Sequence, residues 1–262
     1  MYLEVITQQP KMNSGLTPLL FVHGMYCSAF VWENFLPYFA DNGYEAHALS
    51  LRGHGASDGR DRLRLIRTAE YVEDVAQVAG QCHSAPVLIG HSMGGYVIQK
   101  YLERHTAPAA ILLASVPVTG MFKTLVRQAM RHPWQSMKCH LTWSPYAIVE
   151  TPSLAREAFF SADMPAETLN RHFARLQNDS YCVGLEATFF KLPQPSKISP
   201  LPMLVLGAAN DASFSRDEVE ATARAYKTQA EFFPNMAHVM MLESGWRDVA
   251  ERILMWLREK KL

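Results

Sequence analysis

The chain alternates short apolar runs with segments whose apolar residues recur at helical spacing. Each run is bounded by Gly, Pro or polar residues, and none shows the clean alternation expected of a strand with one face in solvent. Runs of this kind are typical of strands that a sheet buries on both faces. They are found at residues 19–22, 46–49, 87–89, 110–113, 203–206 and 231–233.

Amphipathic helices are predicted between these strands. Apolar residues share one helical face over residues 32–39, over residues 71–82 and over residues 246–257, where Ser244 is a candidate N-cap. Because strands and helices alternate along the chain, the pattern predicts an α/β fold. We expect a mostly parallel sheet with helices on its faces.

The alternation is interrupted once, between Val118 and Pro195. This segment has helical periodicity, many aromatic residues and irregularly spaced prolines, and it contains no strand-like run. Since most connections within a domain are only a few residues long, a segment of about eighty residues predicts an inserted subdomain. We therefore expect a core formed by residues 1–117 and 196–262, and a helical cap formed by residues 118–195.

Composition narrows the partners that we expect. The chain has 262 residues, of which 48% are hydrophobic and 19% charged, with 25 Lys and Arg against 25 Asp and Glu. No block of like charges interrupts this balance, so a small neutral or apolar ligand is favoured over nucleic acid or an anionic membrane. No apolar stretch approaches the ~18 residues of a membrane span, and the first residues lack a secretion signal. We therefore expect a cytoplasmic protein without an integral membrane segment.

The four cysteines predict neither a disulfide framework nor a metal site. Cys27, Cys82, Cys139 and Cys182 are far apart in the sequence, and no Cys or His accompanies them at zinc-binding spacing. We interpret them as reduced thiols that behave as small hydrophobic side chains.

One short motif supplies a candidate nucleophile. Ser92 lies in Gly90-His91-Ser92-Met93-Gly94-Gly95, between the apolar run that ends at Ile89 and a helical stretch that begins at Tyr96. In this context Gly-x-Ser-x-Gly is typical of a nucleophile elbow, a tight turn that exposes the serine in a strained backbone conformation. The glycines are needed because side chains at their positions would collide in such a turn.

A serine hydroxyl is a useful nucleophile at neutral pH only when a base removes its proton and an acid orients that base. Asp211 and His238 each follow one of the later predicted strands. The order Ser92, Asp211, His238 is the order expected when the nucleophile ends a central strand and its partners end later strands. We therefore predict Ser92 as the nucleophile, Asp211 as the orienting acid and His238 as the base.

Attack on a carbonyl group creates an oxyanion, which requires hydrogen-bond donors that are fixed in advance. The helix that begins after Ser92 offers the backbone N–H of Met93, with the positive end of the helix dipole behind it. A second donor is the N–H of Met25, because Gly24 lets this part of the chain approach the site closely. We predict the amides of Met25 and Met93 as the oxyanion hole.

Together these motifs resemble the α/β-hydrolase-fold enzymes over nearly the whole chain. The resemblance implies a mostly parallel, eight-stranded sheet flanked by helices, a helical cap at its carboxyl edge, and no metal or organic cofactor. It assigns the same roles to the predicted triad and to the two methionine amides. Within this fold the chain is most similar to the capped esterase and lysophospholipase-like branch. The resemblance is carried by His23-Gly24 with Trp32, Arg52 to Asp58, Gly90 to Gly95, Gly207 to Asp211, and His238.

Some neighbouring residues offer alternative assignments. Many relatives carry the acid three residues after the strand-ending Gly, and that position is Asn210 here. Asn cannot carry the charge that stabilises an imidazolium, so Asp211 is the simpler choice. His91 adjoins Ser92, but successive residues of a strand point to opposite faces. We therefore interpret His91, like His54, as structural.

The apolar residues of the predicted cap favour a substrate with an apolar acyl or alcohol part, and Tyr26 and Trp143 are candidates for its pocket. The activity that we expect is hydrolysis of carboxylic esters through an acyl-enzyme on Ser92. Two other classes stay open, because fold membership does not specify a reaction. One is other chemistry of this fold, namely C–C bond hydrolysis, lactone opening, perhydrolysis or a lyase reaction. The other is a non-catalytic ligand receptor.

Overall fold

Seven strands form a single sheet in the computed structural model, which describes residues 1–12 and 14–262. The strand order is β1-β3-β2-β4-β5-β6-β7, and all neighbouring strands are parallel except the antiparallel pair β1 and β3. Within the described residues the sheet therefore has seven strands rather than the eight that the family resemblance implied. The strands are β1 (Val5–Gln8), β2 (Leu19–Val22), β3 (Ala46–Leu49), β4 (Val87–His91), β5 (Ala110–Leu113), β6 (Met203–Ala208) and β7 (Ala230–Phe233).

The six parallel strands coincide with the predicted apolar runs, whereas the edge strand β1 was not predicted. All residues of β2 to β6 are buried, but β1 is buried in part at Val5 and exposed over its other three residues. An edge strand with exposed side chains lacks the apolar run that marks a central strand. Its register is set by pairing with β3, where Val5 lies opposite Leu49.

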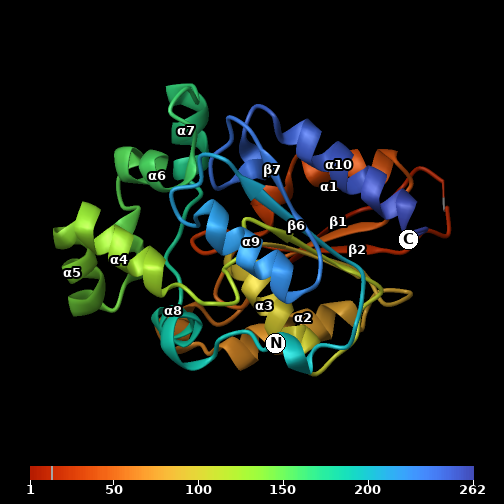
Figure 1. Cartoon of the computed structure of the whole chain (residues 1–262), viewed down its shortest axis with the longest axis horizontal. Coiled ribbons are helices and arrows are strands. Elements are labelled where there is room, and N and C mark those ends of the chain that lie inside the picture. The colour runs from red at the N-terminus through yellow and green to blue at the C-terminus, as the bar shows by residue number, and fades with distance from the viewer. Residues whose placement is uncertain (13) are drawn as a thin grey trace.

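Side chains of successive strand residues enter two separate cores, one on each face of the sheet. Leu19 and Phe21 belong to one core, and Leu20 and Val22 belong to the other. Helices α1 and α10 cover the first face, and α2, α3 and α9 cover the second (Figure 1). Each fully buried Leu or Phe stabilises the fold by about 1.5–3 kcal/mol relative to an exposed one. These helices are α1 (Phe35–Asp41), α2 (Thr68–Ala79), α3 (Met93–Leu102), α9 (Arg216–Ala225) and α10 (Trp246–Glu259).

The ends of α10 differ slightly from the prediction. The helix begins at Trp246 and its N-cap position is Gly245, one residue after the Ser244 that the sequence favoured. Short turns of 3-10 helix occur in the connections between the strands and helices of the core. The short helices of the core are η1 (Ala29–Trp32), η2 (Arg60–Leu65), η5 (Pro195–Lys197) and η6 (Met240–Leu242).

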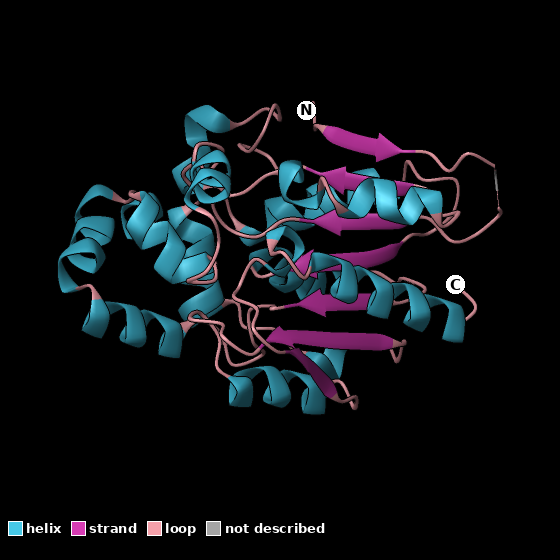
Figure 2. Cartoon of the chain, turned by 90° about the horizontal axis from the view of Figure 1, so that it is seen from above, coloured by secondary structure: helices cyan, strands magenta, loops and turns pink. Residues whose placement is uncertain are grey.

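Between β5 and β6 the chain forms a run of helices, here called the helical insertion (residues 122–190). These helices gather beyond the carboxyl ends of the parallel strands (Figure 2). A separate cap domain with bounds 118–195 stays a prediction. The helices are α4 (Phe122–Arg131), α5 (Pro133–Thr142), η3 (Pro145–Ile148), α6 (Pro152–Phe159), α7 (Ala166–Phe173), α8 (Tyr181–Leu185) and the π-helical η4 (Glu186–Phe190).

Among the described residues, no helix combines the length and the apolar character that crossing a membrane requires.

Candidate active site

Ser92 occupies the tight turn between β4 and α3. Its backbone has φ 51° and ψ −117°, a conformation that residues with a side chain rarely adopt. The flanking glycines are required by space: a Cβ at Gly90 would lie 2.6 Å from the amide nitrogen of Gly95, and one at Gly94 would collide with the carbonyl of Val22. The turn therefore has the strained geometry that the Gly-x-Ser-x-Gly motif predicted.

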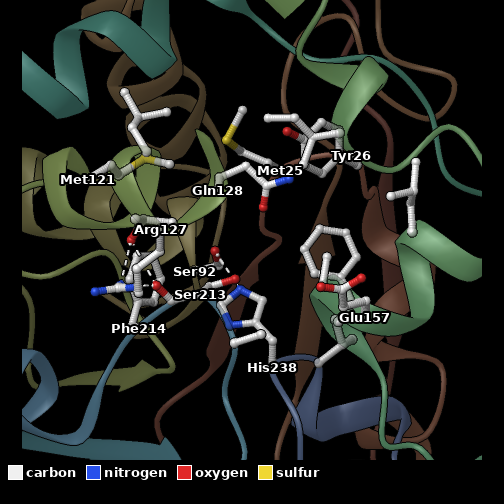
Figure 3. Close-up of a pocket in the computed structure, with 18 of the residues that line it drawn as sticks. Met25, Tyr26, Ser92, Met121, Arg127, Gln128, Glu157, Ser213, Phe214 and His238 are labelled. Carbon is white, nitrogen blue, oxygen red and sulfur yellow. Dashed lines mark hydrogen bonds between the residues drawn. The ribbon is translucent and has the colours of Figure 1, made fainter. Parts of the chain in front are cut away.

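The structure brings Ser92, Asp211 and His238 together in the predicted order. His238 lies in the loop after β7, and its Nε2 is 2.9 Å from Oγ of Ser92 (Figure 3). Its Nδ1 is 2.8 Å from Oδ2 of Asp211, which follows β6. The side chains of His238 and Asp211 are only 3% and 1% exposed, so solvent does not compete for these hydrogen bonds.

The hydrogen bonds of Asp211 determine how the imidazole is protonated. Its other oxygen, Oδ1, accepts hydrogen bonds from the amides of Ser213 at 2.7 Å and Phe214 at 3.2 Å. A carboxylate oxygen only accepts, so Nδ1 of His238 carries the hydrogen that is donated to Oδ2. The lone pair of Nε2 then faces the hydroxyl of Ser92. Asn210, which occupies the alternative position for the acid, is exposed. Its backbone N–H donates to the carbonyl of Met236.

Three rings hold the imidazole of His238 from different sides. Phe159 of α6 stacks on it, with ring centroids 5.7 Å apart and an angle of 27° between the planes. Phe214 packs edge-on at 5.5 Å, and His91 lies 4.8 Å away. The sequence did not reveal Phe159 or Phe214, because neither lies in a motif. Phe159 is also one of many aromatic residues in the insertion.

The ring of His91 is hydrogen-bonded to the backbone of His238, and its structural role stays a prediction. Its Nε2 donates to the carbonyl oxygen of His238 at 3.0 Å, since a carbonyl only accepts. Burial, and then the neighbouring His238, lower the pKa of His91 well below its ordinary value. A neutral His91 therefore fixes the backbone of His238 without competing for the proton of Ser92.

The backbone of Gly24, the residue before Met25, lies close to Ser92. A Cβ added at Gly24 would be 2.9 Å from Cβ of Ser92 and 2.7 Å from Nδ1 of His91. Met93 is the first residue of α3 and is 1% exposed. Of the two residues predicted for the oxyanion hole, Met93 follows Ser92 directly in sequence, and Met25 follows Gly24, which approaches Ser92 closely.

Sequence comparison identifies the family of this chain. Residues 19–252 match the alpha/beta hydrolase family. The chain belongs to that family.

Individual relatives of this alpha/beta hydrolase align over part of their length. It is 28% identical over 98 residues to a pyrethroid hydrolase of Sphingobium wenxiniae, an alignment that covers 37% of the chain and 35% of that relative. It is 32% identical over 107 residues to a non-heme chloroperoxidase of Streptomyces lividans. That alignment covers 38% of this chain and 37% of the chloroperoxidase. The chain thus spans about a third of the length of these curated relatives.

Solved structures resemble the hydrolase over nearly its whole length. A thermophilic esterase from Thermogutta terrifontis superposes with a TM-score of 0.76 at 19% identity, covering 98% of this chain and 93% of the esterase. An esterase from Exiguobacterium antarcticum superposes with a TM-score of 0.73 at 17% identity, covering 98% and 95%. At these identities the likeness establishes the fold.

A pocket of about 930 Å³, counted with its open mouth, lies over Ser92 in the hydrolase (Figure 3). The core contributes Met25, Tyr26, Phe214 and Val239 to its wall, and the helical insertion contributes a larger set. Burial raises the pKa of Tyr26 well above its ordinary value, so its hydroxyl is neutral. Met121, which precedes the insertion, also lines the pocket. The residues from the insertion are Thr124, Leu125, Arg127, Gln128, Arg131, His132, Ile148, Leu154, Glu157, Ala158 and Phe159.

Of the two residues predicted for the substrate pocket, only Tyr26 lines it. Trp143 lies elsewhere: it is 52% exposed, its ring stacks on Tyr181 at 5.4 Å, and it lines a second groove beside residues 60–65. The prediction failed because the direction of a side chain at the end of α5 depends on how the insertion folds. Helical periodicity does not contain that information.

The described residues contain no cluster of three or more His, Cys, Asp or Glu side chains arranged to hold a metal ion. The four cysteines are free thiols, and Cys27, Cys139 and Cys182 are buried. Burial raises the pKa of Cys139 to about 11. Such a thiol is protonated at neutral pH and is a poor nucleophile.

Proposed function

We propose that this alpha/beta hydrolase cleaves carboxylic esters of apolar small molecules through an acyl-enzyme on Ser92. The observation that carries the proposal is the continuous chain of hydrogen bonds from Asp211 through His238 to Ser92, at 2.8 and 2.9 Å, below a largely apolar pocket. A serine, a neutral imidazole and a buried carboxylate in this order are the components of nucleophilic acyl transfer.

In the first half of the reaction, Oγ of Ser92 attacks the carbonyl carbon of the ester while Nε2 of His238 removes the hydroxyl proton. The carbonyl π bond becomes an oxyanion, and the new imidazolium is stabilised by the charge of Asp211. The tetrahedral intermediate then collapses. The bond to the alcohol oxygen breaks, that oxygen takes the proton from His238, and the acyl group stays on Ser92.

The amides of Met25 and Met93 are the proposed donors to the oxyanion. Met25 follows Gly24, which approaches Ser92 closely, and Met93 begins α3, so the positive end of the helix dipole faces the same oxygen. Loss of one such donor typically lowers kcat by about 10²–10³-fold. Fixed amides need no reorganisation as charge develops, which is why they favour the transition state over the bound ester.

In the second half, water attacks the acyl carbon and transfers a proton to His238. The oxyanion forms again, and the bond to Oγ of Ser92 breaks as Oγ recovers the proton from His238. The products are the carboxylic acid and the free enzyme. No redox partner enters this balance.

The pocket wall supports an apolar acyl chain as the group that is recognised. Residues 118–195 form a cap in this proposal, because helices of the insertion line the pocket around Ser92. Leu125, Ile148 and Leu154 offer aliphatic contacts, and the neutral hydroxyl of Tyr26 brings no charge. Polar groups of the pocket, such as Arg127 and Glu157, already have ionic partners.

The decisive experiment measures kcat/KM on p-nitrophenyl esters from acetyl to palmitoyl, with Ser92→Ala as the matched inactive variant. We expect turnover by the wild type, an optimum at one chain length, and loss of turnover by at least about 10³-fold in Ser92→Ala. A fluorophosphonate should label the wild type and not the variant. Full activity in Ser92→Ala would refute the assignment of the nucleophile.

The other classes give different results in the same assays. Lactone opening, C–C bond hydrolysis or a lyase reaction would leave the ester series flat while the matching substrates react. Perhydrolysis would require hydrogen peroxide in place of water as the second nucleophile, and would produce a peracid. A receptor would bind a small molecule tightly and turn over none of these substrates.

A further inference from the structure

A buried carboxylate outside the proposed triad connects the helical insertion to the loop beside Ser92. Asp179 lies between α7 and α8 and is 0% exposed. Its Oδ2 accepts hydrogen bonds from the amide of Tyr26 at 2.9 Å and from Nε2 of His54 at 3.1 Å. Its Oδ1 accepts from the amide of Ser180 at 2.6 Å and, more weakly, from the hydroxyl of Tyr71 at 3.5 Å.

The partners of His54 make it a cation. Its Nδ1 is 3.1 Å from the carbonyl oxygen of Arg52, and its Nε2 faces the carboxylate of Asp179. Both groups are acceptors, so both ring nitrogens carry hydrogen. Burial would raise the pKa of Asp179, but the charge of His54 and the hydrogen bonds that the carboxylate accepts hold this pKa below its ordinary value. The pair is therefore ionic although both side chains are 0% exposed.

The ring of His23 lies beside that of His54, with centroids 5.0 Å apart, but it is neutral. His23 donates through Nδ1 to the carbonyl of Gly24 at 2.8 Å, and its Nε2 accepts from the amide of Leu51 at 3.0 Å. This pattern fits only the neutral ring. Burial, and then the charge of His54, lower the pKa of His23 to about 3. Of these two neighbouring buried rings, the one that faces Asp179 is charged.

The carboxylate holds a strained residue in place. Tyr26 has φ 65°, in the left-handed region that disfavours residues with a side chain. Its amide is bound by Asp179, and its carbonyl accepts from the amide of Gln177 at 2.9 Å. The side-chain Nε2 of Gln177 donates to the carbonyl of Cys27 at 2.9 Å. Gln177 and Asp179 thus bind the amide and the carbonyl of Tyr26 and the carbonyl of Cys27, the two residues that follow Met25.

We propose that Asp179 is a positioning residue, whose buried pair with His54 fixes the amide of Tyr26 and thereby holds the amide of Met25 over Ser92. This inference rests on the proposed function, because it requires Met25 to donate to the oxyanion. Its consequence is that the helical insertion, besides lining the pocket, controls whether the oxyanion hole is assembled.

The ionised carboxylate of Asp179 holds the amide of Tyr26 more strongly than a neutral acceptor would. Hydrogen bonds to an ionised carboxylate are shorter and stronger than neutral ones, and they resist the tendency of Tyr26 to leave its strained conformation. In Asp179→Asn the side chain has the same shape, but it has one acceptor oxygen and presents an NH2 group to one of the present donors. One of the amides of Tyr26 and Ser180, or the ring of His54, then loses its partner.

The test compares Asp179→Asn with wild type on p-nitrophenyl butyrate and on n-butylboronic acid. The boronate forms a tetrahedral adduct on serine and puts an oxygen where the oxyanion develops. We expect kcat to fall by about 10²-fold, the value of one oxyanion donor, with KM unchanged. The inhibition constant of the boronate should rise by the same factor. A residue that only stabilises the fold would not move these quantities together.

Glu186→Gln is the matched control. Glu186 also belongs to the helical insertion, is 7% exposed, and accepts a backbone hydrogen bond from the core, from the amide of Thr68 at 2.8 Å. It binds the start of α2 instead of the loop beside Ser92. We expect wild-type kcat and boronate inhibition in this variant. An equal loss in Glu186→Gln would overturn the inference, because any loosening of the insertion would then be sufficient.

A double variant covers the case in which Asp179→Asn does not fold. Replacing a buried ion pair by apolar residues of similar size often preserves stability, so His54→Leu with Asp179→Leu should fold. It leaves the amide of Tyr26 without an acceptor, and we expect the same loss of kcat. A folded double variant with wild-type kcat would refute the positioning role.

Ser92→Ala separates this inference from the proposed function. If Ser92→Ala retains turnover, the nucleophile is wrong and the oxyanion hole loses its basis. If Ser92→Ala is inactive while folded Asp179→Asn keeps wild-type kcat, the function stands and only the role of Asp179 fails.

Discussion

The carboxylate of Asp211 and the imidazole of His238 form a hydrogen bond of 2.8 Å in which both side chains are almost fully buried. The neighbouring Asn210 is exposed and takes no part in it. The turn after β6 therefore brings Asp211, and not Asn210, to Nδ1 of His238. The other oxygen of Asp211 binds two backbone amides, which fixes the orientation of the carboxylate.

We predict that Asp211→Asn lowers kcat on p-nitrophenyl butyrate by about 10⁴-fold, because an amide can donate to Nδ1 and favour the wrong tautomer of His238. Asn210→Ala should keep wild-type kcat. Steady-state kinetics of the two variants, together with thermal melts that verify folding, make the comparison. A loss in Asn210→Ala with activity retained in Asp211→Asn would exchange the two assignments.

We predict that Gly24→Ala lowers kcat by about 10²-fold, the value of one oxyanion donor. The added Cβ would approach Cβ of Ser92 to 2.9 Å and Nδ1 of His91 to 2.7 Å, so the loop that carries Met25 must shift away. Gly184→Ala is the matched control, since a Cβ at Gly184 meets nothing within 4 Å. Equal activity of both variants would show that the loop moves without affecting catalysis.

We predict that Phe159→Leu lowers kcat while Phe160→Leu does not. The two residues adjoin each other and are 7% and 5% exposed, so the variants should lose similar stability. Only Phe159 stacks on His238, whereas Phe160 stacks on His172. A ring contact of this kind contributes about 1 kcal/mol, which corresponds to about fivefold in kcat. Parallel losses in both variants would assign the effect to general loosening of α6.

The convergence of Ser92, Asp211 and His238 was predictable from the sequence because each of these residues follows a recognisable strand. A buried parallel strand is an uninterrupted apolar run, and the carboxyl ends of parallel strands meet at one edge of the sheet. Ser92, Asp211 and His238 stand at three such ends, so their order along the chain implied their convergence in space. The Gly-x-Ser-x-Gly turn added the steric requirement that the structure verifies at Gly90 and Gly94.

The features that the sequence did not reveal depend on irregular segments or on contacts far apart in sequence. The edge strand β1 has mostly exposed residues and gains its structure from pairing with β3. Asp179 contacts Tyr26 across 153 positions, and neither lies in a periodic pattern that records the contact. Trp143 is an aromatic residue of the kind that often lines pockets, but the turn after α5 places its ring in the groove beside residues 60–65.

Stability in acid supplies a further test, because two buried histidines are held neutral. Burial and the charge of His54 lower the pKa of His23 from 6.5 to about 3, and burial also lowers that of His91. Below pH 6.5 these two histidines bind protons in the unfolded chain but stay neutral in the folded chain. The free energy of unfolding therefore falls as pH decreases from 6.5 toward 3, by about 1.4 kcal/mol per pH unit for each such histidine.

We predict that His23→Gln reduces this slope by about 1.4 kcal/mol per pH unit between pH 4 and 6. Gln offers an oxygen to the amide of Leu51 and an NH2 group to the carbonyl of Gly24, so it reproduces both hydrogen bonds of His23 without titrating. Urea unfolding at several pH values measures the slope, and His83→Gln, at a ring that is 55% exposed, is the control expected to follow wild type. Parallel loss of stability in His23→Gln and wild type would mean that a neutral His23 does not contribute to the acid response.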